Sequence, residues 1–158
     1  MLQRLFPTRI DTIYRGQWIG FWLLAPVLLL KIAIALGSIL TPANASGADG
    51  IDISSFSPAA LRDAASSSAL LGWLHLCIAM VGVLAMARYR AMVPMIYIWL
   101  LVEFLGRRVI LHQYPIDRVA SPAPASIINL VLLTIMGLGL CLSLWPRRRA
   151  DLSADAGV

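Results

Sequence analysis

Residues 18–40 read WIGFWLLAPVLLLKIAIALGSIL, an almost unbroken apolar stretch with a single charged side chain, Lys31. A helix needs about 20 predominantly apolar residues to cross the hydrocarbon core of a bilayer. This stretch therefore predicts a membrane-spanning helix. Pro26 lies inside it and can kink the helix, because proline removes one backbone hydrogen bond.

Three further stretches of the same character occupy residues 69–87, 91–112 and 127–145. Hydrophobic residues make up 59% of the chain, and charged residues make up 13%, against about 25% in an average soluble domain. This composition excludes an ordinary soluble domain and a disordered one. We expect an all-α protein, an antiparallel four-helix transmembrane bundle that occupies residues 18–145.

The arginines are divided unequally between the two sides that four crossings define. The outer side receives Arg62 and Arg118 in its loops, and the inner side receives eight arginines: Arg4, Arg9, Arg15, Arg88, Arg90, Arg147, Arg148 and Arg149. Segments rich in arginine and lysine stay in the cytoplasm. We therefore predict a multi-pass protein of the cell inner membrane with both termini cytoplasmic. The arginines that mark the cytoplasmic side then account for the net charge of +5, and no nucleic-acid partner is expected.

Three segments lie outside the predicted spans. Residues 1–17 predict a cytoplasmic interfacial segment, residues 41–68 an outer loop, and residues 146–158 a basic stretch followed by a disordered tail. An alternative for the N-terminal region is a signal peptide cleaved after residues 43–45, although its apolar stretch is long for one.

The connections between spans also carry local signals. In the outer loop, Ser57 followed by Pro58 predicts the start of a helix that lies on the outer surface before the second span. A link of only three residues, 88–90, makes the second and third spans direct neighbours. Three prolines in residues 113–126 predict an extended, non-helical connection.

Each predicted span contains one polar or ionisable residue near its middle. With a rise of about 1.5 Å per residue, four of them come out about 16–20 Å above the cytoplasmic interface: Lys31, His75, Glu103 and Thr134. Arg107 and Asn129 come out one turn further, at about 24 Å. The six residues therefore predict an intramembrane polar cluster, in which both Lys31 and Arg107 can pair with Glu103.

The positions of these residues around each predicted helix also indicate that they face the inside of the bundle. Gly72, His75, Ala79 and Gly82 share one face of the second span, and small residues allow helices to approach closely. A similar face is predicted on the fourth span, with Ser126, Leu130, Thr134, Gly137 and Cys141. A charge that faces lipid costs several kcal/mol, so all these faces are expected to turn inward.

Two interpretations of the cluster remain open. It is either a buried ion network that fixes helix rotation, or a binding or proton-handling site, since ionisable residues within a membrane are often functional. A third idea takes His75 and His112 as ligands of a b-type haem, but their heights differ by about 13 Å. No motif for a metal or another cofactor is present, so none is expected.

The last three spans resemble the DoxX-like group of small four-helix membrane proteins. The resemblance rests on the long outer loop, the link with Arg88 and Arg90, and Gly106-Arg107 followed by a proline-containing loop. It implies a four-helix fold and, as for some members, a role as an accessory subunit of quinone-linked oxidoreductases. It implies no catalytic residue.

Three function hypotheses follow. The first is a non-enzymatic partner or accessory subunit that binds another membrane protein or forms a homo-oligomer. The second is a small carrier or proton-linked permease that uses the polar cluster and dimerises to enclose a path. The third is an electron-transfer subunit that holds haem or quinone.

Overall fold

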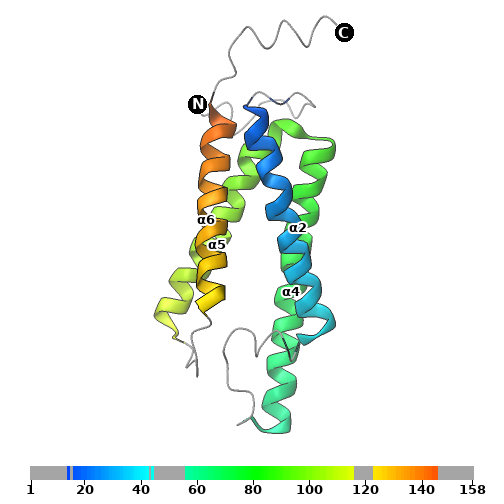
Figure 1. The fold of residues 1–158 in the computed structure, drawn as a ribbon. Coiled ribbons are helices and arrows are strands. Elements are labelled where there is room, and N and C mark those ends of the chain that lie inside the picture. The colour runs from blue at the N-terminus through cyan, green and yellow to red at the C-terminus, as the bar shows by residue number, and fades with distance from the viewer. Residues whose placement is uncertain (1–13, 15, 43, 45–55, 116–122, 146–158) are drawn as a thin grey trace, which may run out of the picture.

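The computed structural model describes residues 14, 16–42, 44, 56–115 and 123–145. This part of the chain is all-α and contains no strand. Its elements are α2 (Trp18–Leu40), α4 (Pro58–Ala87), the short 3₁₀ helix η2 (Arg90–Met92), α5 (Val93–Gln113) and α6 (Ala123–Leu144) (Figure 1). The predictions for residues 1–13, 45–55 and 146–158 lie outside the described residues.

Three helices are long and apolar enough to cross a membrane: α2, α4, and residues Ile127–Leu144 of α6. The fourth predicted span corresponds to α5, which is not among them. From its middle onward, α5 carries three charged side chains, Glu103, Arg107 and Arg108, which interrupt the apolar sequence.

The helix α4 corrects the prediction of a separate helix on the outer surface. It begins at Pro58 as predicted, and the Ser57 hydroxyl accepts a hydrogen bond from the Ala60 amide over 3.3 Å. It then continues without a break for 30 residues, because no glycine or proline interrupts residues 59–71. Its length is about 45 Å, which exceeds the roughly 30 Å hydrocarbon core, and it extends beyond the end of α2 (Figure 1).

The connection before α6 is also more helical than predicted. The helix α6 begins at Ala123, inside the stretch predicted to be extended, and Pro124 falls in its first turn. Proline is well tolerated there, because the first amides of a helix have no intrahelical partner. At the other end of the connection, α5 continues to Gln113.

Small residues bring α2 and α4 together, as the face of the second span predicted. Gly72, Ala79 and Gly82 are all buried. A Cβ at Gly72 would lie 2.9 Å from the Ala35 carbonyl oxygen of α2, and one at Gly82 would lie 2.6 Å from a methyl group of Leu28. The absence of these Cβ atoms therefore sets the distance between the two helices.

The predicted inner face of α6 is wrong. Leu130 is 63% exposed, and Thr134 and Cys141 are exposed as well, while the side chain of Ser126 lies outside the described part. The face that packs inward carries four other residues: Leu132, Met136, Gly139 and Ser143. The whole helix is apolar, so hydrophobic contrast does not mark its inner face.

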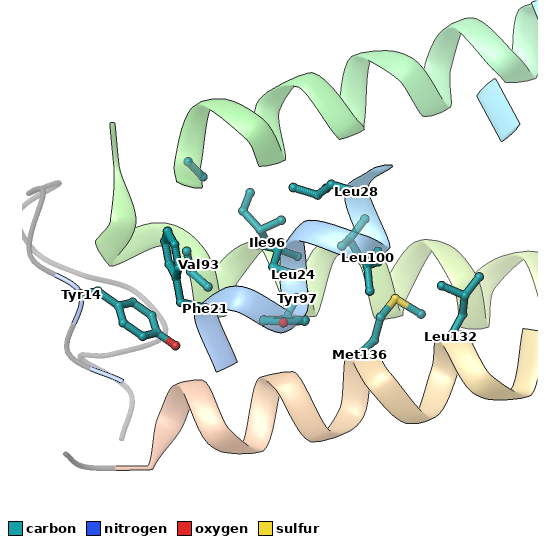
Figure 2. Close-up of a cluster of buried hydrophobic side chains, with 12 residues drawn as sticks. Tyr14, Phe21, Leu24, Leu28, Val93, Ile96, Tyr97, Leu100, Leu132 and Met136 are labelled. Carbon is teal, nitrogen blue, oxygen red and sulfur yellow. The ribbon is translucent and has the colours of Figure 1, made fainter. Parts of the chain in front are cut away.

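The buried apolar cluster lies toward one end of the helices (Figure 2). On α2 it extends as far as Leu28, on α5 as far as Leu100, and on α6 it begins at Leu132. Gln17 at the start of α2 donates its amide hydrogen to the Leu142 carbonyl near the end of α6, so these helix ends meet at the same end of the molecule. Beyond this core, the next turn of α2 carries Lys31 and the next turn of α5 carries Glu103.

Candidate intramembrane ion site

Three helices each contribute one ionisable side chain to a single contact. Lys31 of α2 donates a hydrogen bond to Oε2 of Glu103 on α5. His75 of α4 lies with its Nε2 3.0 Å from Oε1 of the same carboxylate. We call these three residues the ion triad. Their side chains are half-buried, with exposed fractions of 13% for Lys31, 21% for His75 and 20% for Glu103.

Helical spacing places each member of the triad. Lys31 follows the core residue Leu28 by three positions, and Glu103 follows Leu100 by three positions. Residues three or four apart share one face of a helix, so both side chains continue the inward faces of α2 and α5. His75 likewise follows the buried Gly72 on the inward face of α4.

The contacts of Glu103 form an electrically neutral set when the imidazole is neutral. An ionised carboxylate only accepts hydrogen bonds, so the contact with His75 requires a hydrogen on Nε2 and leaves Nδ1 as an acceptor. The Lys31 ammonium balances the carboxylate charge. Insertion of one unpaired charge at mid-membrane costs about 2.5–3.5 kcal/mol, and this pairing would offset much of that cost for a membrane-embedded α5.

The structure does not bring the other predicted cluster residues into this contact. Arg107 lies one turn beyond Glu103, and its side chain is exposed. Asn129 of α6 is partly exposed. Thr134 is exposed, and its hydroxyl donates to the Leu130 carbonyl of its own helix over 2.9 Å. Asn129 was placed by its height, and Thr134 by its height and by its place on the predicted inward face. The observed rotation of α6 turns a different face inward.

The two histidines do not form a haem site between them. The Nε2 atom of His75 contacts Glu103, whereas His112 is exposed nine residues further along α5, about 13 Å away along the axis. Two axial ligands must reach one iron from opposite sides, and this placement keeps them apart. Within the part of the chain that the structure describes, no group of three His, Cys, Asp or Glu residues could hold a metal ion.

One buried polar contact was missed at the sequence level. Tyr97 of α5 is fully buried, and its hydroxyl donates to the backbone carbonyl of Gly20 on α2 over 2.8 Å. Its ring lies where a Cβ of Gly139 on α6 would be, only 2.4 Å away (Figure 2 shows the ring between the helices). A tyrosine in the middle of an apolar stretch was the available signal, since a buried hydroxyl needs a partner.

Aromatic residues gather at the end of the core where α2 begins. Tyr14 packs against Trp18 and Phe21, with ring centroids 6.1 Å and 5.4 Å away. The Arg90 guanidinium lies 6.0 Å from the Trp18 ring centroid and 5.6 Å from that of Phe21, so it makes cation–π contacts. Burial raises the pKa of the Tyr14 phenol well above its usual value, because the charged form is poorly solvated.

No protein-family model, no curated protein and no solved structure matches this chain. Its function is therefore inferred from the ion triad and from the surfaces of the helices.

Proposed function

We propose that the chain is a four-span antiparallel bundle of the cell inner membrane with both termini in the cytoplasm. Three helices that can span a membrane and the unequal distribution of arginines support this topology. The helix α5 becomes the remaining span because Glu103 is neutralised inside the bundle by Lys31. Arg107 and Arg108 lie within two turns of the outer end of α5, where long side chains can reach the headgroups.

We propose further that the protein is a non-enzymatic partner subunit of another membrane protein. The observation that carries this proposal is the exposure of large apolar side chains together with a polar one on neighbouring segments, residues 104–113 of α5 and 127–133 of α6. Val109 and Ile110 are each 59% exposed there, and Leu130 is 63% exposed. A polar side chain on the same segment of α6, Asn129, is partly exposed. Lipid tails offer no hydrogen bonds to such groups, whereas a neighbouring helix can supply them.

Crosslinking from this surface tests the proposal. Photo-crosslinking residues are placed at Val109 on α5 and, as a matched control, at Leu29 on α2, which is 68% exposed. The expected result is one stoichiometric partner protein, copurified in mild detergent and crosslinked from position 109 but not from position 29. Purification of the chain alone as a monomer, or crosslinks only to a second copy of it, would contradict the proposal of a different partner.

A second candidate function is a small carrier or proton-linked permease. The ion triad favours it, because an ion pair of modest exposure between three helices is a site that ions and protons can occupy. A chain of this size encloses a path by pairing with a second copy. Substrate uptake into liposomes that disappears in Glu103→Gln and Lys31→Ala would support this function, and equal uptake in all three proteins would contradict it.

A third candidate function is an electron-transfer subunit, in line with the resemblance to the DoxX-like group. A haem-binding subunit is coloured when purified, with a Soret band that His75→Ala removes. We rank this hypothesis last, because the Nε2 atom of His75 already contacts Glu103 and His112 lies far along α5.

A further inference from the structure

The ion triad lies at the boundary between the packed core and a looser outer half of the bundle. On α5, five residues before Glu103 are buried: Val93, Pro94, Ile96, Tyr97 and Leu100. None of residues 104–113 is buried. Gly106, one turn beyond Glu103, faces open space, because a Cβ there would meet no atom within 4 Å. The triad is therefore closed toward the core and accessible on the α5 side of the outer half, where α2 and α4 stay packed against each other through Gly72.

The charges around Glu103 come from a small number of groups. Lys31 faces it from α2 and His75 from α4. On its own helix, Arg107 and Arg108 follow one turn further out. The described side chains of α6, residues 127–144, include no acidic, basic or histidine residue. Glu103 is thus the one carboxylate among these groups, and it forms an ion pair with the Lys31 ammonium.

We propose that the ion triad binds a monocarboxylate together with one proton. The proton neutralises Glu103, whose carboxyl group then releases Lys31, and the incoming carboxylate takes its place on the Lys31 ammonium. The imidazole Nε2–H of His75 is a second hydrogen-bond donor within reach of that position. No covalent bond forms or breaks, and the proton moves from solvent to a carboxylate oxygen of Glu103.

Charge conservation selects this class of ligand. The resting triad carries one positive and one negative charge. With Glu103 protonated and one monocarboxylate bound, it again carries one of each, so no additional net charge enters the membrane interior. A cation that enters without release of a proton, or a dianion that enters with one proton, leaves a net charge there, which costs several kcal/mol. The exchange of one carboxylate for another also preserves the hydrogen-bonding geometry on Lys31.

This inference deepens the second candidate function but does not need transport to occur. The carboxylate can come from two sources: a water-soluble acid that enters from the outer side, or a fatty acid that enters from the bilayer. Acetate and decanoate present the same headgroup and therefore distinguish the two sources.

Calorimetric titration of the full chain in a nonionic detergent tests the proposal. Sodium acetate or decanoate is titrated at constant ionic strength between pH 6 and pH 8, in two buffers of different ionisation enthalpy. We expect uptake of about one proton per bound carboxylate, so that the apparent Kd rises about tenfold for each unit of pH increase. Binding of neither acid to the folded protein would overturn the proposal.

Variants of the triad locate the proton and the anion. Glu103→Gln imitates the protonated carboxyl group, so it should bind the acid without proton uptake and with little dependence on pH. The double variant Lys31→Met/Glu103→Gln removes both charges and so leaves none unpaired, and it should bind at least 100-fold more weakly. Failure of folded Glu103→Gln to bind, or binding by the double variant as tight as that by Glu103→Gln, would overturn the proposal.

Two controls separate the proton site from its neighbours and from transport. His75→Gln should still take up about one proton per carboxylate, and loss of this uptake would overturn the assignment of the proton to Glu103. His112→Gln, at an exposed histidine outside the triad, should behave as wild type. If the acid binds but is not taken up into liposomes, the carrier function fails while the binding site stands.

Discussion

The hydroxyl of Tyr97 on α5 donates a hydrogen bond to the carbonyl oxygen of Gly20 on α2 over 2.8 Å. The ring of Tyr97 also covers Gly139 of α6, so one side chain joins three helices at the same level. Together with the ion triad, it links all four helices: polar contacts join α2, α4 and α5, and the Tyr97 ring packs against α6. Apolar side chains pack equally well against lipid and against other helices, so they do not fix the rotation of a helix. The contacts of Tyr97 and of the ion triad do fix it.

Substitution of Gly139 by alanine should weaken the bundle. The new Cβ would lie 2.4 Å from the Tyr97 ring, which is fully buried. Overpacking of this kind costs about 1–3 kcal/mol. Gly137→Ala is the matched control on the same helix, because a Cβ there meets no atom within 4 Å. Unfolding in detergent should show a lower midpoint for Gly139→Ala alone, and equal midpoints would contradict the close approach.

Substitution of Tyr97 by phenylalanine tests the hydrogen bond separately from the packing. The ring remains, but the Gly20 carbonyl loses its donor, and a net loss of about 0.5–1.5 kcal/mol is expected. Tyr114→Phe removes a hydroxyl from a residue that is 72% exposed, so its unfolding free energy should stay unchanged. The same detergent unfolding assay compares the two variants, and an equal effect of both would argue against the interhelical bond.

The heights of the polar residues along the helices could be predicted from the sequence. The rotation of each helix about its own axis could be predicted only in part. Lys31, His75 and Glu103 came out at similar heights because the span ends were marked by arginines and by short links. Their rotation could be inferred as well, since a charge or an imidazole is costly in lipid and must turn inward. The three meet in the structure at one carboxylate.

Thr134 shows where this reasoning stops. A threonine satisfies its own hydroxyl by donating to the carbonyl four residues earlier, and here it bonds to Leu130. It is therefore compatible with a lipid-facing position, and its polarity does not fix the rotation of α6. The rotation is set instead by Tyr97, which requires a residue without a side chain at position 139. That requirement links two distant positions, and a single sequence does not reveal the pair.

The contribution of the ion pair to stability should be strongly non-additive. Lys31→Met leaves the Glu103 carboxylate without its cation, and Glu103→Gln leaves the Lys31 ammonium without its anion. Removal of one partner of a fully buried pair costs about 3–5 kcal/mol, and the partial exposure of these side chains lowers the expected cost to about 2 kcal/mol. The double variant should lose less than the sum, with a coupling energy of about 1–2 kcal/mol in a double-mutant cycle of detergent unfolding. Additive effects would show that the pair does not hold α2 against α5.

The topology can be tested by labelling of single cysteines in intact cells. Cys77 and Cys141 are both exposed and are first replaced by alanine, which leaves every arginine in place. Four crossings put Ser67 and Tyr114 on the outer side, and Tyr89 and Trp145 on the cytoplasmic side. A membrane-impermeant maleimide should therefore label Ser67→Cys and Tyr114→Cys in intact spheroplasts, and Tyr89→Cys and Trp145→Cys only after permeabilisation.

The comparison between positions 89 and 114 decides whether α5 crosses the membrane. These residues flank the helix, which carries Glu103, Arg107 and Arg108 and is the least apolar of the four. If the ion triad neutralises Glu103 as the geometry indicates, α5 crosses and the two positions are labelled from opposite sides. Substitution of Lys31 by methionine in the Tyr114→Cys background should then reduce labelling in intact spheroplasts, because the unpaired carboxylate disfavours insertion of α5. Labelling of positions 89 and 114 from the same side would show that α5 does not span the bilayer.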